Sequence, residues 1–458
     1  MNKIHMIGIG GTSMSGIALL LKKEGYIVTG SDRTEGDMTD ILRQNDIPIF
    51  IGSNAELVKD ADIVVYTSAI SQHDSEFVRA KSLNIPTYER AKFLGLLLKC
   101  YKTPICISGT HGKTTTTSML SSIFIDANTD PSIQVGSKFK KLDNLNYRIG
   151  ASNYFILEAC EYVDSFLNFP HNTATILNID EDHLDYFSGI DEIKESFKKF
   201  ISMLPQNGIL VINKDDINCM DIISTLENEL KQKQVQIYTF SLSEPTATIY
   251  AKNISCNIKG FYSFEVTDPK TNETYNFYLT VPGIHNVYDA LAAITTSFAH
   301  GIDFEIMKKS LNEFCGAKRR FEFKKKINDS ILVYDDYAHH PTEIKATLAA
   351  AKQKENNRII AVFQPHTFSR TKELLNDFST AFFDADIAII TDIYASREVD
   401  DGTISSKDLV NKLKENKVDT MYIPKFEDII QYLKKIMRPG DIILTIGAGD
   451  ITHLSDNL

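Results

Sequence analysis

One short polar run limits the possible folds more than any other feature of this chain. Residues 108–117 read Ser-Gly-Thr-His-Gly-Lys-Thr-Thr-Thr-Thr, and they stand between the apolar stretch 104–107 and an apolar helical pattern. Glycines let backbone N–H groups turn toward phosphate oxygens, the lysine adds a positive charge, and the threonine after it can bind Mg²⁺. The run therefore predicts a nucleoside triphosphate site, although Ile107 stands where the common pattern G-x-x-x-x-G-K-[ST] has its first glycine. A turn that only caps a helix is the alternative, and it would need neither the lysine nor the strand.

Length and composition limit what surrounds this loop. A chain of 458 residues is too long for one ordinary core and predicts about three domains. The net charge of −11 argues against a nucleic acid as the main partner. The six cysteines lack C-x-x-C spacing, no apolar run reaches the ~20 residues of a membrane span, and the N-terminus shows no signal-peptide pattern. We therefore expect a cytoplasmic protein without membrane insertion; the oligomeric state stays open.

A second glycine turn lies near the N-terminus. An apolar stretch leads into residues 8–16, Gly-Ile-Gly-Gly-Thr-Ser-Met-Ser-Gly, and then into a helical pattern. The next strand ends near Asp32, about where dinucleotide folds place an acidic residue on a ribose, and the stretch 62–70 ends in small polar residues that include Ser68. On these residues alone an NAD-linked dehydrogenase stays open, although the turn departs from G-x-G-x-x-G. Asp32 and Ser68 are equally explained as turn or helix caps.

Two apolar stretches in the middle of the chain end in carboxylates, one at Glu158 and one in the acidic run 180–185. Carboxyl ends of parallel strands are where sites assemble, so Glu158 would lie near the phosphates, and His183 would supply a second metal position or hold bound water. The alternative for the acidic run is a solvated turn. Residues 205–280 predict short β-like stretches and polar turns that elaborate this domain, and His285 and Asn286 then begin a helix, either as caps or as nucleotide contacts.

Three further strands, at 331–334, 359–363 and 387–390, each end in a polar set. The first leads into Asp-Asp-Tyr-Ala-His-His-Pro-Thr-Glu, the second into Gln-Pro-His-Thr-Phe-Ser-Arg-Thr and the third into Thr-Asp-Ile-Tyr-Ala-Ser-Arg-Glu. Repeated strand–helix units with polar groups at the same end predict a doubly wound parallel sheet, with a crevice over its carboxyl edge.

With these stretches in view, the chain resembles the Mur ligase family along nearly its full length. Seven blocks occur in the family's order: residues 8–16, 109–115, 158–162, 178–185, 318–322, 335–341 and 364–371. The resemblance implies an α/β protein of three domains. These are a Rossmann-like domain for a UDP-sugar (1–102), a central ATP-binding domain of the P-loop ATPase type with a parallel or mixed sheet (103–315), and a Rossmann-like domain for an amino acid (316–458).

The resemblance also implies a reaction. ATP, with Mg²⁺, would convert the lactyl carboxylate of UDP-N-acetylmuramate to an acyl phosphate, which the amine of L-alanine would attack to form an amide in peptidoglycan synthesis. A family member that adds a preformed tripeptide to the same sugar nucleotide is the nearest alternative. An NAD-linked dehydrogenase would leave the loop at 108–117 without a purpose, and a non-catalytic nucleotide-binding module is a third class.

The site residues that the resemblance implies fall into four groups. The sugar-nucleotide side takes Gly10, Gly11, Thr12, Ser13, Met14, Asp32 and Ser68. ATP takes Gly109, Thr110, His111, Gly112, Lys113, Thr114, Thr115, Asn286, Arg320 and Asp336. Mg²⁺ takes Thr114, Glu158 and His183, and the amino acid or acyl phosphate takes Tyr337, His339, His366, Arg370 and Arg397. The catalytic set within these groups is Lys113, Glu158, His183, His339 and Arg370. Two positions depart from the family pattern: Asp289, where asparagine is common, and residues 136–137, where a glycine pair is usual.

Overall fold

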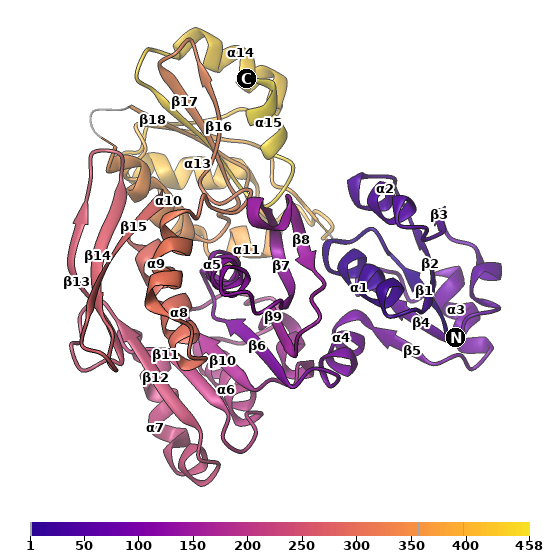
Figure 1. The fold of residues 1–458 in the computed structure, drawn as a ribbon. Helices are drawn as coiled ribbons and strands as arrows, with labels where there is room; N and C mark the ends of the chain where they lie inside the picture. The colour runs from indigo at the N-terminus through magenta and orange to yellow at the C-terminus, as the bar shows by residue number, and fades with distance from the viewer. Residues whose placement is uncertain (1, 355–357, 397) are drawn as a thin grey trace.

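The computed structural model describes residues 2–354, 358–396 and 398–458, whose strands form three sheets (Figure 1). The first sheet is parallel throughout, in the order β3-β2-β1-β4-β5. Its elements are β1 (Lys3–Ile7), α1 (Thr12–Lys23), β2 (Ile27–Asp32), α2 (Asp37–Gln44), β3 (Ile49–Ile51), β4 (Ile63–Tyr66), α3 (Ser75–Ser82), β5 (Thr87–Glu89) and α4 (Arg90–Leu98). This unit lies to one side of the molecule in Figure 1, and α1 faces the central sheet.

The central sheet is mixed, in the order β15-β14-β13-β12-β11-β10-β6-β9-β7-β8. Its strands are β6 (Thr103–Ser108), β7 (Ser132–Phe139), β8 (Leu145–Arg148), β9 (Tyr154–Glu158), β10 (Thr173–Ile176), β11 (Ile209–Asn213), β12 (Gln236–Ser241), β13 (Ile249–Cys256), β14 (Phe261–Thr267) and β15 (Thr274–Pro282). Its helices are α5 (Lys113–Asp126), α6 (Ile190–Ser202), α7 (Ile217–Gln232), α8 (His285–Ala299) and α9 (Phe304–Asn312). The strands next to β6, which are β9 and β10, run parallel to it, so the carboxyl ends of all three meet at one edge.

The third sheet has the order β16-β17-β21-β18-β19-β20, with only β16 antiparallel to its neighbour. Its strands are β16 (Glu322–Ile327), β17 (Ile331–Asp336), β18 (Ile359–Phe363), β19 (Ile387–Ile390), β20 (Thr420–Tyr422) and β21 (Ile442–Ile446). Its helices are α10 (Pro341–Lys352), α11 (Phe368–Glu373), α12 (Leu375–Ser379), α13 (Ser406–Glu415), α14 (Phe426–Ile436) and α15 (Thr452–Asn457). The predicted three-sheet α/β architecture is confirmed.

Helix α5, which follows the polar loop, is buried around its whole circumference. Two of its hydroxyl side chains bond back to the helix itself: Ser118 donates to the carbonyl of Thr114 at 2.7 Å, and Ser122 to that of Ser118 at 2.8 Å. The alanine-rich helix α8 packs against it. The threonine and serine run therefore allows close helix packing and fixes the start of α5, and with it the loop, inside the molecule.

One prediction for the central segment is wrong. Residues 205–280 were expected to hold only β-like stretches and turns, but α7 runs for 16 residues within them. Asp216 caps this helix by accepting the N–H of Cys219 at 2.8 Å, and only three of its side chains are fully buried. Its apolar stripe is therefore too sparse to show as a helical period. Among the helices of the described residues, none combines the length and apolar character needed to cross a bilayer.

Candidate active site

The loop between β6 and α5 has a backbone that requires its glycines. Gly109 and Gly112 have φ angles of +144° and +85°, in the region that favours glycine, and a Cβ on Gly109 would lie 2.9 Å from the Cβ of Leu177. The side chain of Asn178 then holds the loop from the end of β10. Its Oδ1 accepts the N–H of His111 at 2.8 Å, and its Nδ2 donates to the carbonyl of the same residue at 3.1 Å. The loop is thus a formed cradle at the start of a buried helix.

Lys113 folds back over this loop. Its Nζ donates to the carbonyls of Gly109 at 2.5 Å and Thr110 at 2.9 Å, and it pairs with Glu161 at 3.1 Å. Burial favours the neutral amine, but the neighbouring Glu161 carboxylate raises the pKa of Lys113 above its ordinary value. The lysine is therefore a cation at every pH near neutrality.

Glu158 ends β9, one strand away from the loop. Its Oε1 accepts the N–H of Gly136 at 2.8 Å, and its carboxylate also accepts a hydrogen bond from Thr114. Burial raises the pKa of Glu158, while these bonds and the charge of Arg320 oppose the rise. A Cβ on Gly136 would lie 2.6 Å from Glu158 Oε2, so a larger residue at this position would displace the Glu158 carboxylate. Thr114 and Glu158 together offer hard oxygen donors of the kind that Mg²⁺ binds.

His183 lies in the loop that follows β10, where its ring stacks on Tyr162 with centroids 4.4 Å apart. Its Nε2 lies 3.8 Å from the carboxylate of Asp182, which in turn accepts from Arg370 Nη2 at 3.1 Å. Burial lowers the pKa of His183, so its ring is neutral and keeps a lone pair for a ligand. Burial opposes the charge of Asp182, but the Arg370 guanidinium lowers its pKa well below the usual range.

Residues of the third sheet gather around this Asp182–Arg370 pair. The ring of His339 lies 5.4 Å from that of Tyr337 and 5.8 Å from that of His366, and Arg370 Nη1 lies 3.3 Å from His366 Nδ1. Burial lowers the pKa of His339 to about 3 and that of His366 to about 4, so both rings are neutral. Together with Asp182, these four residues form what we call the arginine cluster. It contains the predicted amino-acid residues except Arg397, which lies outside the described residues.

A cavity of about 480 Å³ opens beside the loop, between the central and third sheets. The predicted ATP residues that line it are His111, Gly112, Thr115, Asn286, Arg320 and Asp336. Burial raises the pKa of Asp336 to about 6, and its two oxygens accept the N–H groups of Phe321 and Ala338, each at 2.8 Å. Asp289 also lines the cavity, accepts from Thr116 Oγ1 at 3.0 Å and has its pKa raised by burial to about 7.

A second cavity, of about 780 Å³, lies over the carboxyl edge of the first sheet. The predicted residues lining it are Gly10, Gly11, Thr12, Ser13, Met14 and Asp32. Ser68 is not among them, although both of its neighbours are. Asp32 holds the glycine turn itself, since its carboxylate accepts the N–H of Gly10 at 2.8 Å and that of Thr34 at 3.3 Å. Three cations that sequence reasoning missed, Arg33, Arg90 and Lys138, also line it, and Lys138 comes from β7 of the central sheet.

The three parts of the chain match three family models in order. The model described as "Mur ligase family, catalytic domain" matches residues 3–102, "Mur ligase middle domain" matches 107–297, and "Mur ligase, glutamate ligase domain" matches 319–449. The chain belongs to the Mur ligase family. A UDP-N-acetylmuramate–L-alanine ligase of Acetivibrio thermocellus is 49% identical to it over 99% of this chain and 94% of the relative.

Solved structures of two other Mur ligases resemble the whole chain. The UDP-N-acetylmuramate-alanine ligase of Thermotoga maritima superposes with a TM-score of 0.82 at 29% identity, covering 100% of this chain and 98% of the other. A murein peptide ligase of Psychrobacter arcticus gives 0.74 at 25% identity, with the same coverage.

Sequence reasoning missed several residues of this Mur ligase site. Glu161 and Asn178 hold the loop through a pair with Lys113 and hydrogen bonds to His111, contacts that the sequence does not show. Asp182 was left open as part of a solvated turn, yet it is buried and paired with Arg370.

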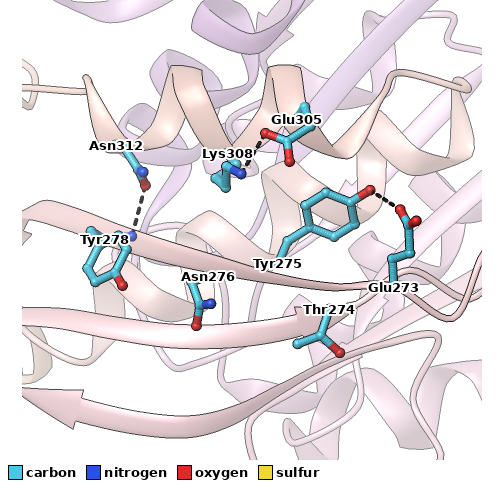
Figure 2. Close-up of a pocket in the computed structure, with 8 residues that line it drawn as sticks. All are labelled: Glu273, Thr274, Tyr275, Asn276, Tyr278, Glu305, Lys308 and Asn312. Carbon is cyan, nitrogen blue, oxygen red and sulfur yellow. Dashed lines mark hydrogen bonds and ion pairs between the residues drawn. The ribbon is translucent and has the colours of Figure 1, made fainter.

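A further hollow of about 470 Å³ between β15 and α9 lies apart from these strand ends (Figure 2). Its charged side chains are satisfied internally, Lys308 by Glu305 at 2.5 Å and Glu273 by the Tyr275 hydroxyl at 2.8 Å. It holds none of the predicted residues.

Proposed function

We propose that this Mur ligase joins L-alanine to the lactyl carboxylate of UDP-N-acetylmuramate, with ATP converted to ADP and phosphate, in peptidoglycan synthesis. The observation that carries the proposal is the 49% identity, over nearly the full chain, to a UDP-N-acetylmuramate–L-alanine ligase. The site has the parts that such a reaction needs: a phosphate loop with a charged lysine, a cluster with an arginine, and a separate cavity at a glycine turn.

We assign the sugar nucleotide to residues 1–102, ATP to residues 103–315 and the amino acid to residues 316–458. The glycine turn and the cations Arg90 and Lys138 suit a diphosphate in the first cavity. The 480 Å³ cavity suits ATP, whose phosphates would lie on the loop beside Lys113. A cytoplasmic location follows from this use of ATP.

The residues of the site have separate roles in the proposed reaction. Lys113, already protonated, stabilises the charge that spreads over the γ-phosphoryl group as it passes to the lactyl carboxylate. Thr114 and Glu158, with neutral His183, fit Mg²⁺ by their donor chemistry, and the ion would neutralise phosphate charge when bound. Arg370 presents a planar fork that suits the carboxylate of alanine, and His339 belongs to the same cluster. Closure between the sheets keeps water from the acyl phosphate.

Phosphate release tests the proposal. We expect release that requires both UDP-N-acetylmuramate and L-alanine, with the amide product formed in equal amount. Release with an L-alanyl tripeptide but not with alanine would instead assign the chain to the murein peptide ligases, although the lower TM-score and identity to that enzyme favour alanine. Nucleotide binding without release would indicate a non-catalytic module.

A further inference from the structure

The side chain of His111 points away from the phosphate loop, toward the third sheet. Its Nε2 lies 3.2 Å from Asp180 Oδ2, and its Nδ1 lies 3.4 Å from Glu343 Oε1, in the first turn of α10. Asp180 also accepts from the Thr342 hydroxyl at 3.1 Å. These four residues, which we call the His111 tie, connect the ATP loop and the end of β10 to a helix more than 160 positions later in the chain.

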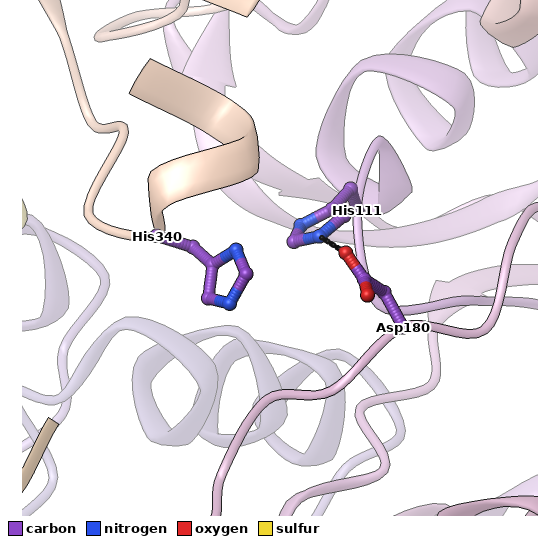
Figure 3. A group of neighbouring side chains, drawn as sticks. All are labelled: His111, Asp180 and His340. Carbon is purple, nitrogen blue, oxygen red and sulfur yellow. Dashed lines mark hydrogen bonds and ion pairs between the residues drawn. The ribbon is translucent and has the colours of Figure 1, made fainter. Parts of the chain in front are cut away.

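The neighbouring ring of His340 makes this group look like a metal site, because ligand atoms of His111, Asp180 and His340 lie within 4.8 Å of one another (Figure 3). The hydrogen bonds argue against that. Both nitrogens of His111 face carboxylate oxygens, which only accept, so both nitrogens donate and neither keeps a lone pair for a metal. His340 Nδ1 accepts the N–H of Thr342 at 3.3 Å, which leaves the proton on Nε2. The group is an ion-pair network.

Glu343 also contacts His339, a member of the arginine cluster. Its Oε2 accepts the backbone N–H of His339 at 3.0 Å and lies 3.3 Å from that residue's Nδ1, while its other oxygen faces His111. Burial opposes the charge of Glu343, but the bond to His111 and the charge of Arg320 lower its pKa well below the usual value. One carboxylate therefore caps α10, positions His339 and contacts the phosphate loop.

We propose that His111 is a positioning residue for the amino-acid step, whose charged ring fastens the ATP loop to the first turn of α10 and so sets His339 against the reacting phosphate. The proposal rests on the proposed function for its substrates. In this proposal the side chain of His111 positions His339, which the backbone of the loop does not do. It also gives ATP binding and alanine binding a shared element, because movement of the loop moves the partner of Glu343.

The charge of His111 depends on the groups that face it. Asp180 and Glu343 contact it directly, the ring of His340 lies 5.0 Å away, and Arg320 and His339 act on it through Glu343. Burial opposes protonation, yet the bonds to Asp180 and Glu343 raise the pKa of His111 to about 9. The pKa of His111 is raised because its ring is bonded to Asp180 and Glu343. The His111 tie is therefore complete at neutral pH and is lost as pH rises through about 9.

A double-mutant cycle tests the tie. His111→Gln keeps a hydrogen-bond donor for Asp180 but loses the positive charge and the bond to Glu343. Glu343→Gln keeps an acceptor for the backbone N–H of His339 at the start of α10 but not an acceptor for His111. We expect each variant to raise the KM for alanine by about 10-fold, as loss of a charged hydrogen bond does, with ATP affinity in calorimetry changed less than about twofold. The double variant should be no worse than the poorer single one. Thr342→Val, which removes only a neutral bond to Asp180, is the matched control and should change the KM less.

Two further readouts separate the outcomes. The ratio of kcat/KM between the unaltered protein and His111→Gln should fall toward one as pH rises through about 9, and alanine's own titration cancels in this ratio. Hydrogen exchange of the first turn of α10 should accelerate in His111→Gln, a result that needs no activity. If the unaltered protein released no phosphate with alanine, the proposed function would fail while this exchange still tested the tie.

Three results would overturn the proposal. Additive effects in the double variant would show that the two side chains act independently. Weaker ATP binding in His111→Gln with an unchanged KM for alanine would make His111 a phosphate contact. Stoichiometric Zn²⁺ or Mn²⁺ in the unaltered protein, absent from His111→Gln, would make the group a metal site.

Discussion

Asp289 is a buried carboxyl group against the phosphate loop, and its titration should control the stability of the protein. A Cβ on Gly112 would collide with its Oδ1, so the two lie in direct contact. Burial raises the pKa of Asp289 from 3.8 to about 7. Each pKa unit between the unfolded and folded states corresponds to about 1.4 kcal/mol, so an ionised Asp289 costs the folded protein about 4 kcal/mol above neutral pH.

The variant Asp289→Asn removes this titration and keeps the shape. The stability that protonated Asp289 gives the folded protein is complete below the pKa that this group has in the unfolded chain. It is lost as pH rises through the pKa that the group has in the folded protein. Between about pH 5 and about pH 8.5, the free energy of unfolding should therefore fall by about 3 kcal/mol more in the unaltered protein than in Asp289→Asn. Urea denaturation of both proteins at the two pH values measures this difference.

A matched change at Thr116 gives the control. Its hydroxyl donates to Asp289 at 3.0 Å and lowers the pKa of the carboxyl, so Thr116→Val should raise that pKa and steepen the loss of stability with pH. The reasoning is refuted if Asp289→Asn differs from the unaltered protein by the same free energy at both pH values, because the carboxyl would then not titrate between them.

Three other predictions concern the reaction. Lys113→Ala should lower the rate of phosphate release on the order of 10²-fold or more while UDP-N-acetylmuramate binding, measured by calorimetry, stays unchanged; turnover near the parent rate would remove the lysine from catalysis. Glu158→Gln should shift a Mg²⁺ titration of activity to higher concentration because the amide lacks the charge that attracts a hard cation, and superimposable titrations would make Glu158 structural. Arg370→Lys should raise the KM for alanine with the ATP and sugar-nucleotide constants unchanged, because lysine lacks the fork that now holds Asp182; an alanine KM and kcat equal to the parent's would exclude Arg370 from the amino-acid site.

The sequence predicts the three sheets well, because parallel strands buried on both faces read as continuous apolar runs. β18 and β19 begin and end at the predicted residues. Helix α7 was not predicted, because most of its side chains are partly exposed and its apolar period is therefore weak. The antiparallel strands β13–β15 fall almost wholly in the stretch predicted to hold short β-like elements, whereas β21 was not predicted.

For the site, sequence motifs locate the phosphate loop and the strand ends. They do not show which side chains of these segments contact one another. The loop's glycines and lysine are adjacent in sequence, so their spacing alone predicts a cradle. The pairs Arg370–Asp182 and His111–Glu343 join residues 188 and 232 positions apart, and a single sequence contains no signal for such contacts. Asp32 was open between a ribose contact and a turn cap; its carboxylate accepts the N–H of Gly10, and the residue also lines the 780 Å³ cavity.

The pairing of Lys113 with Glu161 makes nucleotide binding an exchange of anions. Glu161 pairs with the lysine, and the carbonyls of Gly109 and Thr110 hold its ammonium group over the loop. The fold of the loop is therefore held by contacts within the protein itself. Affinity is then set by how much more strongly the lysine interacts with phosphate than with Glu161. Under the proposed function, a change at Glu161 would alter ATP affinity by changing the anion that ATP must displace.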